Sequence, residues 1–199
     1  MSSPIKLTYL DVTGRAEITR LVFAASGIAF EDKRIGYPDL PALKHTLPLG
    51  QVPIIEMGGK TYPQSMAIAR YAARIAGLYP TDDLEALNVE VVLETLVEVA
   101  AGFGEIIWGT PEDAKAAKIK VWTDDKLPKV FSLIESSIKG KFLLGDKLSV
   151  ADLRLFDLFA NSILLAIPDY KLDAYPKVAA VIENVKAVPN VAAYLAKRQ

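Results

Sequence analysis

Three short stretches of the sequence carry side chains that could do chemistry together. The first, KLTYLDVTGRAE, places the phenol of Tyr9 at the end of a strand-like run and the guanidinium of Arg15 just after a glycine-containing turn. A phenol can donate a hydrogen bond to a charged acceptor, and a guanidinium adds a positive charge that does not titrate. Because loops between rigid elements often hold binding groups, we predict a binding site at this turn.

The second stretch, GQVPIIE, has a proline at the edge of a β-rich run. Proline removes one hydrogen bond from a sheet, so Pro53 stands either at the start of an edge strand or after a cis peptide bond in a turn. In the cis form, the backbone N–H and C=O of Val52 would point outward and could pair with an extended peptide. From these residues alone, both the cis form and an ordinary trans proline remain open.

The third stretch, YPQSMAIAR, marks the passage from a strand to a helix. Ser65 is a suitable N-cap, and capping alone explains a serine at this place. The free N–H groups and the dipole at a helix start also suit a carboxylate or phosphate ligand, which Gln64 and Ser65 could hold.

The composition excludes several other kinds of site. The 199 residues contain no cysteine and a single histidine, His45, which excludes a disulfide framework, a cysteine nucleophile and a multi-histidine metal site. The sequence lacks the P-loop, G-x-G-x-x-G and G-x-S-x-G patterns. The net charge of −1 provides no basic field for nucleic acid or an anionic membrane. We expect His45 to lie in a surface loop and to have no role in catalysis.

The chain also shows no sign of membrane insertion or export. No stretch approaches the roughly 20 consecutive apolar residues that span a bilayer, and the first residues lack the apolar core of a secretory signal. We therefore expect a cytosolic protein that binds neither nucleic acid nor a membrane.

The elements that must position the three stretches divide the chain into two halves. Strands and helices alternate first, in the order β-α-β, a short helix, then β-β-α. Helical patterns alone follow, with prolines at their edges. The expected strands cover 5–10, 29–35, 52–57 and 60–63, and the expected helices 14–27, 64–77, 83–108, 111–138, 150–167, 175–187 and 189–197. We predict an α/β domain over residues 1–79 and an all-α domain over residues 83–199.

Taken together, the three stretches resemble the cytosolic glutathione transferases, and the sigma-like class most closely. The resemblance covers essentially the whole chain and includes LSVADL, which is similar to the N-capping motif of the family's helical core, with Ser149 and Asp152 at capping-box spacing. It implies a thioredoxin-like glutathione-binding domain followed by an all-helical domain that carries the hydrophobic substrate site. It also implies a detoxifying transferase that joins glutathione, its co-substrate, to hydrophobic electrophiles without a metal.

The resemblance assigns roles to single residues. Tyr9 would donate its hydroxyl to the glutathione sulfur, and Arg15 would stabilise the charge of the site. Gln64 and Ser65 would hold the γ-glutamyl carboxylate, and Val52 would pair with the cysteinyl unit. The further glutathione contacts that it implies are Leu40, Lys44 and Gln51 toward the glycyl end, Pro53 in its cis form, and Glu98 of the partner subunit.

Two positions depart from the family's pattern. Relatives have a tryptophan near position 40, whereas Leu40 cannot donate a hydrogen bond, so we expect a weaker contact with the glycyl end of glutathione. The acidic pair of some sigma enzymes reads Val97-Glu98 here, which argues against a divalent ion at a dimer axis.

Elementary energetics agree with the role implied for Tyr9. A thiol with a pKa of about 8.5 is mostly protonated at neutral pH. A hydrogen bond to a charged acceptor contributes about 1.5–3 kcal/mol, which lowers that pKa by one to two units. One well-placed tyrosine can therefore produce mostly thiolate near pH 7.

The site of the second substrate has weaker signals. Gly102 and Gly104 interrupt a helix, and they either open an apolar pocket or allow close helix packing. An apolar pocket would suit a hydrophobic electrophile. The candidate lining residues are Val12, Thr13, Phe103 and Trp108.

Charge rows suggest assembly. Arg70 and Arg74 are four residues apart on one expected helix, and Glu90, Glu94 and Glu98 repeat at the same spacing on another. Like charges at this spacing repel each other, and a complementary face would relieve both rows, although two solvated rows are also possible. The family's two-fold dimer pairs these helices, so we expect a homodimer.

Three other functions remain open on the sequence. The chain could be an S-crystallin-like relative with weak activity, a carrier that binds apolar ligands without turnover, or a glutathione-dependent prostaglandin-type isomerase. Tyr9, Arg15, Gln64 and Ser65 are all present, which favours the transferase.

Overall fold

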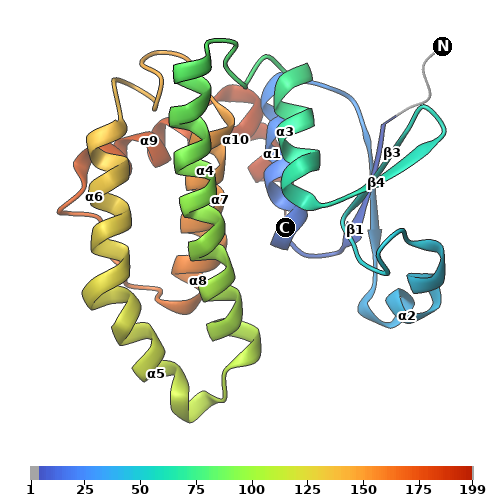
Figure 1. Ribbon diagram of the computed structural model, residues 1–199, viewed down its shortest axis with the longest axis horizontal. Helices are drawn as coiled ribbons and strands as arrows, with labels where there is room; N and C mark the ends of the chain where they lie inside the picture. The colour runs from blue at the N-terminus through green and yellow to red at the C-terminus, as the bar shows by residue number, and fades with distance from the viewer. Residues whose placement is uncertain (1–4, 199) are drawn as a thin grey trace. The chain divides into compact units, whose positions relative to one another are not determined.

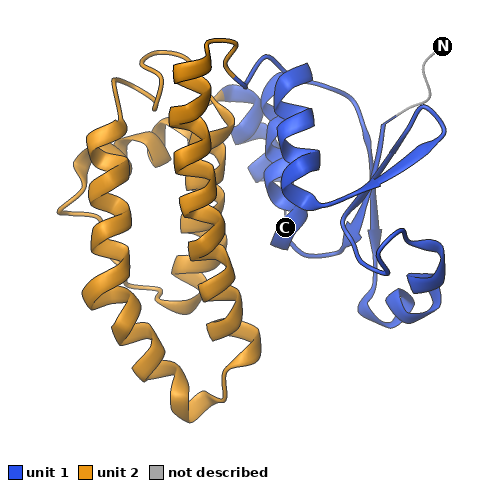
Figure 2. Ribbon diagram, in the orientation of Figure 1, with its two compact units in different colours: residues 1–79, 189–199 blue, residues 80–188 orange. Residues whose placement is uncertain are grey.

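The computed structural model describes residues 5–198 and forms two compact units. One unit contains the chain up to Tyr79 together with the segment from Pro189 onward, and the other contains Pro80–Val188 (Figure 2). The break at residue 79 falls where the change from mixed to helical patterns predicts it. The prediction places all residues from 83 onward in one helical domain, but the last helix, α10 (Pro189–Lys197), belongs to the first unit.

The first unit is built on a four-stranded mixed sheet with the strand order β2-β1-β3-β4 (Figure 1). β1 and β2 are parallel, and β3 is antiparallel to both β1 and β4. This is the predicted β-α-β and β-β-α order, and it confirms the thioredoxin-like arrangement. The strands are β1 (Lys6–Leu10), β2 (Glu31–Ile35), β3 (Ile54–Met57) and β4 (Lys60–Pro63).

Helices α1 and α3 lie together on one face of this sheet (Figure 1). Apolar residues at helical spacing, such as Ile18, Leu21 and Val22 of α1, are fully buried, which explains why this helix forms against the sheet. α1 ends at Gly27, whose φ of 70° is the left-handed conformation typical of a helix end. The helices of the unit are η1 (Gly14–Ala16), α1 (Glu17–Ser26), η2 (Tyr37–Asp39), α2 (Leu40–Leu43), η3 (Lys44–Thr46), α3 (Ser65–Ile75) and α10 (Pro189–Lys197).

The C-terminal helix α10 packs on α1, which corrects the assignment of residues 189–199 to the helical domain. Val191 is fully buried, and the Asn190 side chain donates to the backbone carbonyl of Ala25 at 3.4 Å. The Tyr194 hydroxyl donates to the buried carboxylate of Glu17 at 3.0 Å. Helix periodicity predicts α10 itself, but it does not reveal these partners in α1.

The second unit is helical throughout its regular elements, as predicted. The predicted helix over 111–138 is α5 and α6 joined by a π-helical turn, and a similar turn follows α4. Its elements are α4 (Asp83–Gly104), η4 (Glu105–Gly109), α5 (Glu112–Val121), η5 (Trp122–Lys126), α6 (Leu127–Ser137), α7 (Val150–Leu158), η6 (Phe159–Ile163), α8 (Leu164–Ala166) and α9 (Pro176–Lys186). Every residue of α7 is buried, so α7 is the central helix of this unit.

The start of α7 contains the predicted capping box. The backbone N–H and the hydroxyl of Ser149 donate to the Asp152 carboxylate at 2.8 and 2.7 Å. The backbone N–H of Leu143 donates to the other carboxylate oxygen at 2.8 Å. A single buried carboxylate therefore joins the preceding loop to the central helix.

We expect Asp152→Ala to lower the free energy of unfolding by about 3 kcal/mol, because it leaves buried donors without an acceptor. Urea unfolding of both proteins measures this difference. Asp146→Ala, at an exposed position of the same loop, is the matched control and should stay within about 0.5 kcal/mol of the parent protein. Equal midpoints for the two variants would contradict this role of Asp152.

Candidate functional site

Tyr9 lies in β1 with its side chain buried and its hydroxyl beside the segment that follows the strand. Residues 10–15, from the last residue of β1 to the second residue of η1, are called the tyrosine turn below. The Tyr9 hydroxyl oxygen accepts a hydrogen bond from the backbone N–H of Arg15 at 3.1 Å. A phenol has one proton to donate and can also accept, so this bond leaves the hydroxyl proton available for an external acceptor.

Gly14 permits this arrangement for two reasons. Its φ is 45°, a left-handed conformation that side chains other than glycine adopt at a cost. A Cβ atom at this position would also lie 2.6 Å from the Tyr9 hydroxyl oxygen. The glycine therefore allows the backbone to reach the phenol and to direct the Arg15 N–H toward it.

A pocket in the first unit brings together residues from all three stretches. Its volume is about 280 Å³, including space open to solvent. Its lining residues are Arg15, Leu49, Gln51, Val52, Pro53, Pro63, Gln64 and Ser65. Six of these eight are predicted site residues, and they come from positions up to 50 residues apart in the chain. The guanidinium and the start of α3 both favour an anionic ligand here.

The peptide bond between Val52 and Pro53 is cis. The structure thus decides between the two forms that the sequence leaves open. Pairing of β3 with β1 begins at Ile54, opposite Thr8, so Val52 stands just outside the sheet ladder. Its position before the strand and its place in the pocket are compatible with pairing to an extended ligand.

Gln64 has a backbone conformation that the sequence does not reveal. Its φ is 79° and its ψ is 100°, and within residues 5–198 no other non-glycine residue has a positive φ. Residues in sparsely populated backbone conformations cost about 1–3 kcal/mol each, and they cluster at active sites, ligand clamps and switch regions. It occurs directly before Ser65, the first residue of α3, and therefore inside the pocket.

We expect Gln64→Gly to be more stable than Gln64→Ala by about 1–2 kcal/mol, because glycine adopts a positive φ without a Cβ penalty. Both variants lack the side-chain amide, so the difference between them reports the free-energy cost of the positive φ alone. The midpoints of urea unfolding measure this difference. Alanine and glycine variants of equal stability would show that this backbone is not strained.

Tyr9 is not among the residues that line this pocket, although the backbone N–H bonded to its hydroxyl belongs to the lining residue Arg15. Other predicted glutathione contacts also lie outside the lining. Leu40 begins α2 and is half-buried, and Lys44 begins η3 and is exposed. His45 is also exposed in this segment. In the second unit, Glu98 is exposed on α4.

The candidates for an electrophile pocket have different surroundings. In the tyrosine turn, Val12 is 37% exposed and Thr13 is half-buried. Trp108 lies in η4 and is 78% exposed, whereas Phe103 is fully buried with its ring centroid 5.3 Å from that of Trp122. Phe103 is thus a core residue of the second unit.

The two helix glycines of this region also differ. A Cβ on Gly102 would collide with the Trp122 ring, which favours close packing at this position. A Cβ on Gly104 would have nothing within 4 Å, so space does not require glycine there.

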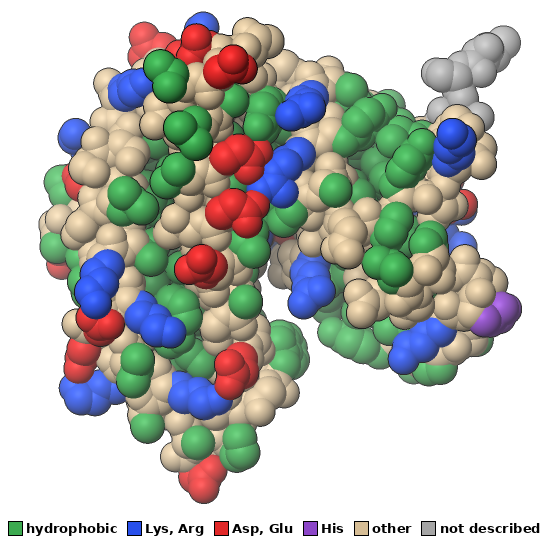
Figure 3. Space-filling view, in the orientation of Figure 1, with side chains coloured by type: hydrophobic (Ala, Val, Ile, Leu, Met, Phe, Trp, Pro, Cys, Tyr) green, Lys and Arg blue, Asp and Glu red, His purple; other side chains and the backbone are tan. Residues whose placement is uncertain are grey.

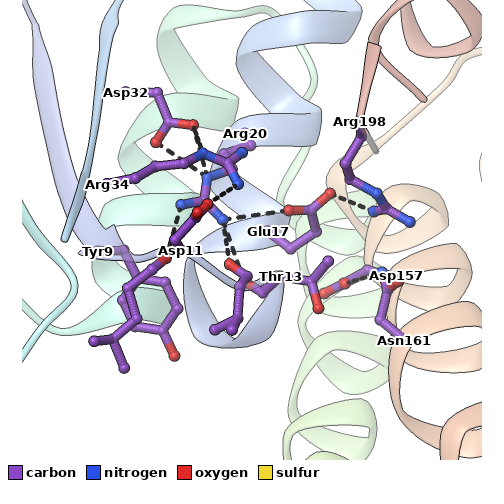
Figure 4. A network of polar contacts seen from close by, with 12 residues as sticks. Tyr9, Asp11, Thr13, Glu17, Arg20, Asp32, Arg34, Asp157, Asn161 and Arg198 are labelled. Carbon is purple, nitrogen blue, oxygen red and sulfur yellow. Dashed lines mark hydrogen bonds and ion pairs between the residues drawn. The ribbon is translucent and has the colours of Figure 1, made fainter. Parts of the chain in front are cut away.

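A buried charged cluster beside the tyrosine turn was missed by sequence reasoning (Figure 4). Glu17 and Arg20 of α1 are fully buried, and their side chains are 3.5 Å apart. Two charged residues, three positions apart in an otherwise uncharged helix, are the sequence signal that could have revealed the pair.

Residues 5–198 contain no group of histidine, cysteine, aspartate and glutamate side chains that could hold a metal ion. Among the same residues, no helix has the length and apolar character needed to cross a membrane.

Two family profiles match this chain. The N-terminal domain of glutathione S-transferase matches residues 5–74, and the C-terminal domain of glutathione S-transferase matches residues 98–198. The chain is 32% identical over 195 residues to hematopoietic prostaglandin D synthase of Homo sapiens, covering 97% of this chain and 96% of that protein. It is 33% identical over 195 residues to glutathione S-transferase P of Caenorhabditis elegans, and the match covers 98% of this chain and 93% of that protein.

Solved structures show the same similarity. The sigma class glutathione transferase of Fasciola hepatica has a TM-score of 0.90 at 29% identity, covering 98% of this chain and 97% of that chain. Rat hematopoietic prostaglandin D synthase complexed with a quinoline has a TM-score of 0.88 at 31% identity, covering 99% and 98%.

Proposed function

The chain belongs to the cytosolic glutathione transferases, among relatives of the sigma- and pi-like classes, and on this premise we propose that it conjugates glutathione to hydrophobic electrophiles. The observation that carries the proposal is the Tyr9 hydroxyl, which accepts from the Arg15 N–H and keeps its own proton to donate. Arg15 also lines the pocket, which supports a place for the ligand's charged sulfur nearby.

The proposed chemistry is activation of the glutathione thiol. The Tyr9 hydroxyl donates a hydrogen bond to the sulfur and stabilises the thiolate relative to the thiol. A donor to a charged acceptor contributes about 1.5–3 kcal/mol, which lowers the thiol pKa by one to two units. Arg15 adds a fixed positive charge at the same pocket. The thiol proton passes to solvent. The thiolate then forms a bond to the electrophilic carbon of a substrate held beside it, and the leaving group, chloride in the case of chlorodinitrobenzene, departs with the electron pair of the bond that breaks.

The remaining pocket residues would hold the peptide part of glutathione. We assign the γ-glutamyl carboxylate to Gln64 and Ser65, since the N-terminus of α3 has unpaired N–H groups and a favourable dipole. The backbone of Val52, beside cis Pro53, would pair with the cysteinyl unit. Lys44 and Gln51 would face the glycyl carboxylate, where Leu40 provides no donor.

The electrophile is assigned to apolar surface in each unit. Val12 and Thr13 belong to the tyrosine turn and therefore stand next to the proposed thiolate. In the second unit, the exposed Trp108 is the proposed aromatic contact, whereas Phe103 is fully buried against Trp122 and is not assigned to the electrophile.

A glutathione-dependent isomerisation of a prostaglandin-type substrate is a second candidate. It is favoured by the 32% identity with hematopoietic prostaglandin D synthase over nearly the full length of both chains. The same thiolate would serve this reaction, so the two candidates differ in the electrophile and not in the activation of glutathione.

We also propose that the chain forms a homodimer in the cytoplasm, with Glu98 of the partner subunit near the γ-glutamyl ammonium. Acidic side chains lie along α4 and basic side chains over α3 (Figure 3). Large apolar side chains are exposed on the same elements, including Leu84 and Leu87 of α4 and Tyr71 of α3. Both features suit a self-complementary interface. A monomeric mass in light scattering at micromolar concentration would contradict it.

Retention on immobilised glutathione, followed by a conjugation assay with chlorodinitrobenzene, tests the proposed function. Retention with turnover supports a transferase. Retention without turnover would instead favour an S-crystallin-like relative or a ligand carrier. Loss of both would overturn the assignment of the glutathione site, and conversion of a prostaglandin endoperoxide with free glutathione would identify the isomerase.

A further inference from the structure

The Arg20 side chain is fully buried and donates hydrogen bonds to backbone carbonyls of the tyrosine turn. Its Nη1 donates to the backbone carbonyl of Val12 at 2.6 Å and to that of Thr13 at 3.4 Å. Its Nη2 donates to the carbonyl of Leu10 at 3.4 Å, and its guanidinium carbon lies 5.8 Å from the centre of the Tyr9 ring. One guanidinium therefore contacts both the phenol ring and the backbone that follows it.

Acidic groups surround Arg20 on two sides (Figure 4). On the β2 side, Asp32 accepts from the Arg20 Nε at 3.1 Å and from the Arg34 Nε at 2.9 Å. Arg34 in turn donates to Asp11 of the tyrosine turn at 3.0 Å. On the α1 side, the only acid within the described residues at ion-pair distance is Glu17, at 3.5 Å from Nη1.

Glu17 is fully buried and takes its closer partners from the C-terminal segment. Its Oε1 accepts from the Tyr194 hydroxyl at 3.0 Å and from the Arg198 Nη1 at 2.6 Å. Burial and the Glu17 carboxylate raise the pKa of Tyr194, so this phenol stays protonated and donates. A buried carboxylate without such partners would be strongly unfavourable.

The distances show how these contacts are balanced. Arg20 approaches the Val12 carbonyl more closely than it approaches Glu17, although Glu17 carries a full negative charge. Arg198 and Tyr194 both bind Oε1 of Glu17 and compensate much of its charge. Arg20 lies 3.5 Å from the other oxygen, Oε2, and binds the Val12 carbonyl more closely. Without Arg198, the Glu17 carboxylate would keep only the Tyr194 hydroxyl and Arg20 as partners. It would then attract Arg20 more strongly, away from the two longer carbonyl bonds, those to Leu10 and Thr13.

We propose that Tyr194 and Arg198 are positioning residues for the thiol-activating Tyr9. They hold the Glu17 carboxylate, and Arg20 thereby keeps its bonds to the tyrosine turn. The C-terminal segment, in which Arg198 is 181 residues from Glu17, would thus set the geometry of the sulfur's hydrogen-bond donor. This inference rests on the proposed function, because it gives Tyr9 a role in glutathione activation.

The test compares Arg198→Ala, Arg198→Lys and Tyr194→Phe in the full chain, with Lys197→Ala as the matched control. Lys197 is exposed and carries the same charge one residue earlier. The measured quantities are the pKa of the bound glutathione thiol, from the ultraviolet absorbance of the thiolate against pH, and kcat and KM. Thermal melting checks that each variant is folded.

For Arg198→Ala we expect the thiol pKa to rise by about one unit, and kcat at pH 7 to fall about fivefold. KM for glutathione should change less than about twofold, since the pocket residues are untouched. Arg198→Lys should recover most of the loss by restoring a cation at Glu17. Tyr194→Phe removes one hydrogen bond to Glu17, so it should raise the thiol pKa by a smaller amount. If Arg198→Ala does not fold, Tyr194→Phe decides whether the C-terminal segment positions Tyr9.

A double variant separates positioning from a general effect. In the Tyr9→Phe background, Arg198→Ala should cause no further rise of the thiol pKa, because its effect acts through Tyr9. An equal rise in both backgrounds, or an unchanged pKa in a folded Arg198→Ala, would overturn the positioning role. If Tyr9→Phe itself leaves the thiol pKa unchanged, the proposed function fails instead.

Discussion

Tyr9→Phe should lower kcat for conjugation at pH 7 by about tenfold to a hundredfold, while glutathione still binds. The phenol is the proposed donor to the thiolate, and a hydrogen bond to a charged group contributes about 1.5–3 kcal/mol. The peptide part of glutathione is assigned to other residues, so retention on immobilised glutathione should persist. Steady-state assays with chlorodinitrobenzene across pH measure the effect.

The dependence of kcat on pH tests the role of Tyr9 more specifically than the rate at a single pH. Loss of the donor raises the thiol pKa, so the defect should be largest below that value and shrink at higher pH, where the thiol ionises unaided. Tyr37→Phe, at an exposed position outside the pocket lining, is the matched control and should keep the parent profile. Unchanged turnover of Tyr9→Phe at neutral pH would remove Tyr9 from the mechanism.

Gly14→Ala should lower activity by at least about tenfold and also reduce stability, by about 1 kcal/mol or more. The stability loss follows from placing a Cβ on a residue with a φ of 45°. The activity loss follows from the short distance of 2.6 Å between that Cβ and the Tyr9 hydroxyl oxygen, which must move. Even a displacement of about 1 Å at a reacting group can cost up to a hundredfold in rate.

Gly59→Ala separates the two effects of this substitution. Gly59 has a φ of 72° in the hairpin between β3 and β4, and a Cβ there would have nothing within 4 Å. It should therefore lose stability without losing kcat. Unfolding midpoints and steady-state kinetics of both variants compare them. A Gly14→Ala enzyme with the parent kcat would show that the phenol position is not critical.

The elements were predictable where their signals are local. The helix end at Gly27, the Gly58-Gly59 hairpin and the capping box of Ser149 and Asp152 depend on residues a few positions apart, and the structure contains each of them. Helix periodicity likewise predicts α4 to α10 closely. It does not predict the π-helical turns within the long helices, because a one-residue change of hydrogen-bond partner leaves the apolar pattern almost intact.

The pocket was predictable only in part. Arg15, Val52, Pro53, Gln64 and Ser65 could be named because turn, proline and N-cap signals mark the ends of strands and helices. Gln51 is implied only by the resemblance to the glutathione transferases. The burial of Phe103 was not predicted, since an aromatic residue next to helix glycines suits a pocket and a core equally well. Contact with Trp122, 19 residues later, places it in the core.

By itself, the sequence determined the order of the elements, the change from mixed to helical structure near residue 79, and the three stretches that meet at the pocket. It also excluded cysteine, P-loop and multi-histidine chemistry. These properties follow from residue type and short-range spacing. Only the tertiary structure decided the cis form of Val52-Pro53, the positive φ of Gln64 and the burial of Glu17 and Arg20. Each of these depends on what distant segments place beside a residue, as Arg198 and Tyr194 do for Glu17, and local spacing carries no information about such neighbours.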